Sequence, residues 1–154
     1  MYKLDQIDLD ILAALQADGR ITNVALARQV GLSATPCLER VKSLEAAGLI
    51  TGYVARLSAS ALGLGLTVFV QIAIERTSQR VFDAFREAVQ GIPEIEECHM
   101  VAGGFDYLLK TRMADMAAYR AFAGRVLWQL PGVRETRTYA VMEEVKSGTA
   151  LPLG

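Results

Sequence analysis

The sequence contains few of the residues from which disulfide frameworks and metal centres are built. Of its 154 residues, only two are cysteine and one is histidine. Cys37 and Cys98 are far apart in the chain and fit no metal-ligand spacing, so the sequence predicts neither a disulfide framework nor a zinc site. We therefore expect two ordinary, half-buried thiols and no metal or cofactor.

Long apolar runs are absent as well. No stretch approaches the roughly 18 uninterrupted apolar residues of a membrane-spanning helix, and acids and amides near the N-terminus interrupt any signal sequence. We expect a soluble cytoplasmic protein that does not bind membranes. Hydrophobic residues nevertheless make up 52% of the chain and charged residues 21%, which is enough apolar material for a folded core.

The chain also lacks the excess positive charge that is usual in proteins that bind nucleic acids. Its net charge is −1, but four basic residues and one acid lie between Arg20 and Lys42, a local balance of +3. A patch this small predicts weak DNA binding by a single module. Useful affinity would then require a dimer or a larger assembly.

Apolar residues near the N-terminus repeat at helical spacing. Ile7, Ile11 and Leu15 lie four residues apart and predict a helix over residues 5–17, which ends before Gly19. The pattern continues beyond that glycine. Two further short helices are therefore expected before residue 50.

The second predicted helix covers about residues 22–30 and stops at Gly31. Ser33 can then cap a third helix, which carries Pro36 in its first turn, where no intrahelical N–H group is needed, and ends at Gly48. Three short helices with a tight glycine turn between the last two are typical of a helix-turn-helix.

The residue pattern of the sequence changes after this helical region. Residues 49–57 resemble a short strand or strand pair, and residues 58–65 are a linker of mostly small residues. The predicted segments are a helix-turn-helix, winged-helix-like domain at 1–50 (motif about 23–42), a hinge strand and linker at 51–65, a second domain at 66–147 and a tail at 148–154.

The second domain alternates strands and helices, with Gly103–Gly104 as a turn between two of the strands. This order is the ferredoxin-like βαββαβ pattern, so the whole chain is predicted to be an α+β protein. The predicted elements are a strand at 66–75, a helix at 79–89, strands at 95–101 and 107–112, a helix at 116–130 and a strand at 133–145.

The polar residues of the third helix favour a DNA-reading role over the alternative, a small helical bundle. They fall away from the apolar stripe of that helix and would face a groove. Ser33, Thr35 and Arg40 are the candidates for base edges or nearby phosphates, with Arg40 bidentate to guanine as the strongest. The other candidate DNA contacts are basic residues that suit phosphates: Arg20, Arg28 and Lys42.

No set of residues suggests catalysis, so we expect no catalytic residues and no enzyme; His99 is interpreted as a partly exposed structural histidine. The turn at Gly103–Gly104 is a better candidate site. Its backbone N–H groups can approach a carboxylate closely, and Asp106 can accept from an ammonium group, which would suit a free amino acid. The alternative is a plain hairpin with an acidic turn residue.

Several blocks of sequence between Leu4 and about Ser147 are similar to one protein family. They are Asp18–Ile21, Val30–Ser33, Thr35–Val41, Glu96–His99, Phe105–Arg112, Leu130–Val133, Thr136–Tyr139 and Val141–Lys146. In these blocks the chain closely resembles the Lrp/AsnC, or feast/famine, family of transcription regulators.

The resemblance implies a sequence-specific regulator of transcription whose assembly or binding to double-stranded DNA is modulated by a small amino acid. It also implies homodimers that assemble further into octamers and bind the effector between dimers. Carried over from the family, the effector-binding residues are Gly103, Gly104, Asp106, Tyr139, Ala140 and Val141. An amino-acid-binding regulatory subunit of a metabolic enzyme is the alternative function.

The chain departs from the family pattern at four positions. Leucine-responsive members typically have Asp at the position of Gly104 and Val at that of Ala140, and both positions fall in the implied effector site. They also have Pro in place of Ala34 and Leu in place of Trp128. The effector is therefore expected to be an amino acid whose identity the resemblance does not fix.

Overall fold

The computed structural model describes residues 3–75, 78–148 and 150–153. The chain forms two compact units, which are described separately below. The first consists of Met1–Arg56 together with Lys146–Gly154, and the second of Leu57–Val145.

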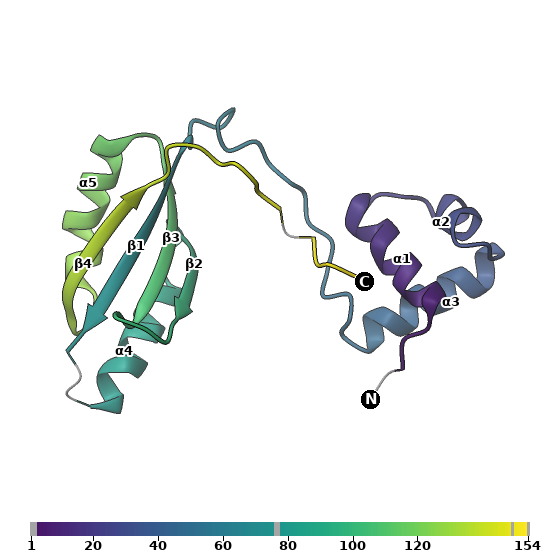
Figure 1. The fold of residues 1–154 in the computed structure, drawn as a ribbon, viewed down its shortest axis with the longest axis horizontal. Coiled ribbons are helices and arrows are strands. Elements are labelled where there is room, and N and C mark those ends of the chain that lie inside the picture. The colour runs from purple at the N-terminus through teal and green to yellow at the C-terminus, as the bar shows by residue number, and fades with distance from the viewer. Residues whose placement is uncertain (1–2, 76–77, 149, 154) are drawn as a thin grey trace. The chain divides into compact units, whose positions relative to one another are not determined.

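The first unit contains the three predicted helices, α1 (Gln6–Ala17), α2 (Asn23–Gln29) and α3 (Ala34–Ala46) (Figure 1). Asp5 caps α1 through a reciprocal capping box with Asp8, in which each carboxylate accepts the other residue's backbone N–H. Gly31 takes the left-handed conformation, with φ of 72°, that the tight turn between α2 and α3 requires. The core residues of this unit are Ile11, Ala14, Leu26, Ala27, Cys37 and Leu44.

The predicted strand at residues 49–57 does not form. The structure describes all of residues 49–57, and none of them is in a strand. A strand needs a partner to satisfy its backbone groups, and the apolar run alone cannot supply one.

The end of the chain packs against the first helix, a contact that the sequence did not suggest. The side-chain amide of Gln16 in α1 donates to the carbonyl of Leu151 at 3.2 Å and accepts from its backbone N–H at 2.6 Å. The last residues therefore belong to the helix-turn-helix unit and are more than a loose tail.

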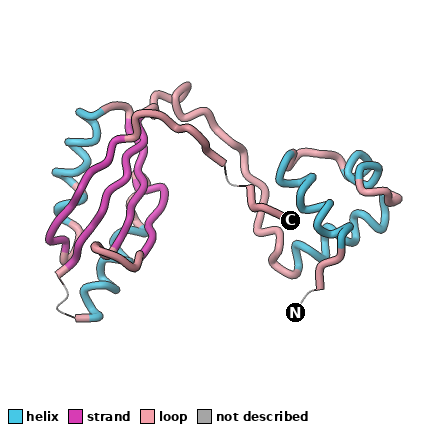
Figure 2. Tube along the Cα trace, in the orientation of Figure 1, coloured by secondary structure: helices cyan, strands magenta, loops and turns pink. Residues whose placement is uncertain are grey.

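The second unit confirms the ferredoxin-like prediction. Its four strands form one sheet in the order β2-β3-β1-β4, and every neighbouring pair is antiparallel (Figures 1 and 2). The elements are β1 (Leu66–Ile74), α4 (Gln79–Gln90), β2 (Ile95–Met100), β3 (Tyr107–Met113), α5 (Met116–Arg125), a 3₁₀ turn η1 (Leu127–Gln129) and β4 (Val133–Ala140). The final helix and strand are thus shorter than predicted.

Alternation along the central strand β1 divides the sheet into two faces. Val68, Val70, Ile72 and Ile74 point into a core that includes Phe85, Phe122 and Leu127 from the helical segments. The intervening β1 residues, Phe69, Gln71 and Ala73, lie on the opposite face by the twofold period of a strand. We call that side the helix-free face.

Two negative findings apply to the described residues. None of their helices is long and apolar enough to cross a membrane. They also contain no group of three or more side chains that could hold a metal ion. The half-buried thiol expected from the sequence is correct for Cys98 and wrong for Cys37, which is fully buried, and this burial raises the pKa of the Cys37 thiol.

Candidate functional site

The solvent-facing side of α3 carries a stripe of one polar, one apolar and one basic side chain. Cys37 and Leu44 are buried, whereas Thr35, Leu38 and Lys42 are exposed at helical spacing on the opposite side. Thr35 and Lys42 were predicted as DNA contacts. Leu38, exposed to 41%, was not, although an exposed apolar side chain on such a helix suits contact with a thymine methyl group.

Arg40 is held inside the unit. Its Nη1 donates to Asp5 at 2.8 Å and to Asp8 at 2.7 Å, and its side chain is 33% exposed. These two carboxylates form the capping box of α1, so Arg40 connects the start of α1 to the middle of α3. The guanidinium that was expected to reach a base is therefore bonded to two carboxylates of its own unit.

A short hydrogen bond sets the position of α2 against α3. The amide of Asn23, at the start of α2, donates to the carbonyl of Ala34 at 2.7 Å. After Gly31, the backbone N–H of Leu32 returns to the carbonyl of Ala27 at 2.8 Å. The first turn of α3 is consequently fixed relative to α2, which is the arrangement that a helix-turn-helix needs to present its second helix.

The remaining predicted DNA contacts are exposed. Ser33 occupies the N-cap position of α3, yet within the described chain its hydroxyl makes no capping hydrogen bond. Arg28 lies in the last turn of α2, and Arg20 lies just before that helix. The structure therefore leaves the side chains of all three residues at the surface of the first unit.

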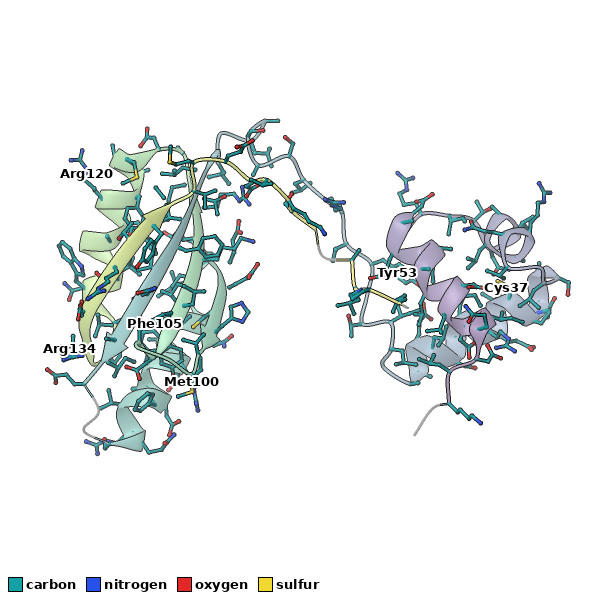
Figure 3. All side chains as sticks on the ribbon, viewed as in Figure 1. Cys37, Tyr53, Met100, Phe105, Arg120 and Arg134 are labelled. Atoms are coloured by element: carbon teal, nitrogen blue, oxygen red, sulfur yellow. The ribbon has the colours of Figure 1, made fainter. Side chains whose placement is uncertain are left out.

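The other candidate site is the segment between β2 and β3, where Figure 3 labels Phe105. Gly103 and Gly104 are exposed. Asp106 is 6% exposed, and its carboxylate accepts from the backbone N–H of Ile74 at 2.8 Å. Its own N–H donates to the carbonyl of Ile72 at 2.9 Å, so Asp106 anchors this segment to the end of β1.

The other three predicted effector residues lie at the far end of the strands. Tyr139 pairs with Phe69 and Ala140 with Val68, near the start of β1, and the Val141 N–H bonds to Thr67. Tyr107, which follows Asp106, pairs instead with Ile72. The register separates the two groups by at least three residues along β1, about 10 Å. One copy of the sheet therefore does not bring them together.

Different residues surround the Gly104 segment. A hollow of about 140 Å³ lies beside it on the helix-free face, lined by Gln71, Ala73, Gly104, Phe105, Glu135 and Arg137. Sequence reasoning missed its β4 residues. The alternation Glu135, Arg137, Tyr139 along the last strand was the available signal, because alternate residues of a strand share one face.

Ion pairs cover another part of the helix-free face. Lys110 donates to Glu97 at 2.8 Å, and this hydrogen bond is the main reason that the pKa of Glu97 is lowered. The Nε2 of His99 lies 3.1 Å from a carboxylate oxygen of Glu97, and the side chain is exposed, which agrees with its interpretation from the sequence as far as exposure is concerned. Glu144 accepts from Thr67 and Arg112, and the Thr67 hydroxyl is the main cause of its lowered pKa.

A helix-turn-helix unit followed by a ferredoxin-like unit is the architecture of a class of two-domain transcription regulators. Family models match both parts. Residues 4–51 match a winged helix-turn-helix DNA-binding domain, and residues 67–151 match the Lrp/AsnC ligand-binding domain. The chain belongs to the Lrp/AsnC family of DNA-binding transcription regulators.

Individual relatives agree with this assignment. The leucine-responsive regulatory proteins of Klebsiella pneumoniae and Escherichia coli K12 are each 57% identical to this chain, over 96% of it and 90% of their own length. Among solved structures, a transcriptional regulator from Neisseria meningitidis in complex with L-Met is 39% identical, with a TM-score of 0.94 and coverage of 98% and 97% of the two chains. An AsnC-family regulator from Agrobacterium tumefaciens is 37% identical, with a TM-score of 0.93 over 97% of each chain.

Proposed function

We propose that this regulator acts in the cytoplasm as a homodimer that inserts two copies of α3 into successive major grooves, about 34 Å apart. Its DNA site would then be an imperfect palindrome. Binding of a free amino acid to the second unit alters the assembly or the DNA affinity, and dimers associate further, up to octamers. The observation that carries the DNA-reading part is the exposed stripe of α3. The helix that bears it is fixed by the hydrogen bond from Asn23 to Ala34 and by the ion pair of Arg40 with Asp8.

Within that stripe, Thr35 and Leu38 contact base edges, and Lys42 contacts a phosphate. Ser33, Arg20 and Arg28 add contacts to the DNA backbone, by a side-chain hydroxyl or by charge. Arg40 acts as a positioning residue, because its Nη1 is bonded to Asp5 and Asp8.

An effector that is an amino acid is supported by the relative that was solved with L-Met and by the leucine-responsive relatives. Gly103 and Gly104 offer exposed backbone to such a ligand, and Asp106 holds their segment against β1. A ligand changes the regulator only if its affinity differs between two states of the assembly.

A second copy of the chain completes the effector site. Gly103–Asp106 and Tyr139–Val141 lie toward opposite ends of the sheet within one chain. A two-fold partner that faced the same surface would run in the reverse direction and bring its own Tyr139–Val141 toward the first copy's Gly103–Asp106. Tyr139 is 47% exposed on the helix-free face, as such an interface requires.

The assignment of DNA contacts is tested with a fragment selected from random DNA by the wild-type protein. Thr35→Ala and Leu38→Ala should each weaken binding to this fragment by about 1–3 kcal/mol and change unrelated DNA little. Lys42→Ala should weaken binding to both kinds of DNA and reduce the slope of log K against log salt by about 1. Fluorescence anisotropy titrations measure both quantities.

Arg120→Ala is the control, because this exposed cation belongs to the second unit. It should leave the affinity and the salt slope unchanged. The assignment of α3 fails if Lys42→Ala has the same salt slope as the wild type and the two stripe variants lose affinity for all DNA alike.

A further inference from the structure

We propose that the end of the chain is a second tether between the two units, and that it determines which spacing of DNA half-sites the regulator accepts. Gln16 is the positioning residue that anchors this tether, through Leu151, to the first unit. The inference rests on the proposed dimer, whose two copies of α3 reach two half-sites at once. We call residues 144–151 the C-terminal tether and residues 53–66 the linker.

The anchor on α1 is a two-point contact. The side-chain amide of Gln16 accepts from the Leu151 N–H at 2.6 Å and donates to the Leu151 carbonyl at 3.2 Å, so it satisfies both backbone groups of that residue. The side chain of Leu153 is half-buried, whereas Leu151 is 69% exposed. Backbone hydrogen bonds, rather than the Leu151 side chain, therefore hold the end of the tether on α1.

The linker is fixed at the same end of α1. The Tyr53 hydroxyl donates to Glu45 at 3.0 Å, and the ring lies where a Cβ on Gly19 would contact it at 3.7 Å. Gly19 lies just beyond α1 and three positions after Gln16. Both connecting segments therefore leave the first unit beside the C-terminal end of α1.

Both segments are also fixed near one point of the second unit. The linker ends at Leu66, the first residue of β1. The next residue, Thr67, donates from its hydroxyl to Glu144 at 3.0 Å and accepts the Val141 N–H through its carbonyl at 2.9 Å. Arg112 adds a hydrogen bond to Glu144 at 3.2 Å. The C-terminal tether therefore starts where the linker enters the sheet.

The two segments differ in length although they connect the same two places. Tyr53 and Leu66 are 13 positions apart, whereas Glu144 and Leu151 are only seven positions apart. An extended chain spans at most about 3.6 Å per residue, which gives limits of roughly 45 Å for the linker and 25 Å for the tether. The shorter segment therefore sets how far the helix-turn-helix unit can move from its own second unit.

This limit has a direct effect on DNA recognition by a dimer. Two linked DNA-binding units bind together only if the connection spans both half-sites, and a connection that is too long lowers the effective concentration of the second unit. With the tether docked on α1, we expect a strict half-site spacing. With the tether released, the longer linker permits several spacings, each at lower affinity.

Fragments that carry the same two half-sites with spacers changed by about one to four base pairs test this role. We expect the full-length wild type to lose at least about 10-fold in affinity when the spacer changes by two base pairs, about 7 Å of helix axis. Gln16→Ala, and a chain that ends at Gly148, should lose less than about 3-fold at the same step. Both variants should also bind the best fragment about 3- to 10-fold more weakly than wild type.

Gln6→Ala is the matched control, because Gln6 is also an exposed glutamine of α1, and its side chain donates to Asp10 of the same helix at 3.0 Å. It should keep the wild-type spacing profile. Circular dichroism verifies that each variant is folded, and light scattering measures its assembly. A relaxed spacing that occurs only in variants with altered assembly would overturn the tether and assign the tail to assembly instead.

A distance measurement tests the tether without DNA. Spin labels are attached at Gln29→Cys and Arg120→Cys, exposed positions of the first and second units, in a Cys98→Ser background that leaves only the buried Cys37. Pulsed EPR on labelled chains diluted with unlabelled protein then reports the distance within one chain. We expect Gln16→Ala to broaden the distance distribution and Gln6→Ala to leave it unchanged.

The outcomes separate this inference from the proposed function. If wild type binds single half-sites as tightly as paired ones, the proposed dimeric reading fails, and the EPR distances alone decide whether the tether exists. If wild type prefers one spacing and Gln16→Ala keeps that preference, the role in spacing is overturned while the dimer stands. An unchanged distance distribution in Gln16→Ala overturns the tether itself. Relaxed spacing with a broadened distribution, in Gln16→Ala but not in Gln6→Ala, supports the inference.

Discussion

At the scale of single residues, two charged side chains of this protein hold a helix and a loop in place. Arg40 bonds the capping box of α1, and the buried carboxylate of Asp106 bonds the backbone of β1. Both residues were predicted from the sequence as ligand contacts. The sequence motif does not show whether a charged side chain points toward solvent or toward another part of the protein. The structural partners of Arg40 are two acids that lie 35 and 32 residues earlier in the chain, so the motif alone did not indicate them.

We expect the capping box to make the first unit sensitive to acid. The pKa of Asp5 is lowered, first by the hydrogen bond from the Asp8 backbone and then by Arg40. A carboxyl group whose pKa is lowered on folding stabilises the protein above its unfolded pKa, and this stabilisation is lost as the pH falls through the folded value. We therefore predict that wild type loses stability below about pH 4 more steeply than Asp5→Asn, which keeps a capping side chain but does not titrate.

Urea denaturation of the full-length protein at pH 5 and pH 3.5, followed by circular dichroism, measures this difference. The remaining carboxylates are common to both proteins, so they cancel in the comparison. Equal losses of stability in wild type and Asp5→Asn would show that the Asp5 pKa is not shifted by folding.

At the scale of elements, periodicity in the sequence was enough to predict the three N-terminal helices and the βαββαβ order. The helix expected over 116–130 instead ends at Arg125 and continues as η1, and the strand expected up to residue 145 ends at Ala140. In both cases the apolar pattern continues past the end of the element. Hydrogen-bond partners, which the pattern does not specify, determine where each element stops.

Gly132, between η1 and β4, is the position at which the fold depends most clearly on the absence of a side chain. Its φ is 71°, its carbonyl accepts from the backbone N–H of Glu75, and a Cβ would overlap Val81. Gly132→Ala should therefore destabilise the protein by about 1–3 kcal/mol, through backbone strain and overpacking. Thermal or urea denaturation measures the change.

Gly124→Ala is the control, for which we expect a change in stability of the opposite sign. Gly124 lies in α5, has no left-handed φ, and a Cβ there would meet nothing within 4 Å. Alanine in a helix interior should stabilise the protein by about 0.5–1 kcal/mol. The packing account of Gly132 is wrong if both substitutions shift the unfolding midpoint in the same direction.

At the scale of the whole molecule, the chain forms two units with separate cores. The first matches a DNA-binding domain and the second a ligand-binding domain. The sequence predicted this division, and it singled out two of the three residues of the exposed stripe on α3, because both follow from local patterns. It did not predict that the end of the chain joins the first unit through Gln16 and Leu151, or that Glu135 and Arg137 lie beside Gly104. Such contacts connect distant parts of the chain, so no local spacing reveals them.

The small excess of positive charge between Arg20 and Lys42 bears on how the whole molecule binds DNA. A local balance of +3 limits the number of phosphates that one copy can neutralise. We therefore expect strong binding to require two or more linked copies, since linking turns the second binding event into an intramolecular one. We expect any ligand that alters an association of the second units to change DNA affinity by the same route.

The most direct test of this account is a DNA-binding titration of the full-length protein on its selected fragment at about 50 and 200 mM salt, with and without L-methionine and L-leucine. We predict that affinity falls steeply with salt and that at least one of the two amino acids changes the affinity or the size of the complex at fixed salt. Salt-dependent binding to the fragment that neither amino acid alters would contradict the effector part of the account. Failure to select any fragment from random DNA, with amino-acid binding retained, would contradict the account entirely and favour a regulatory subunit of a metabolic enzyme.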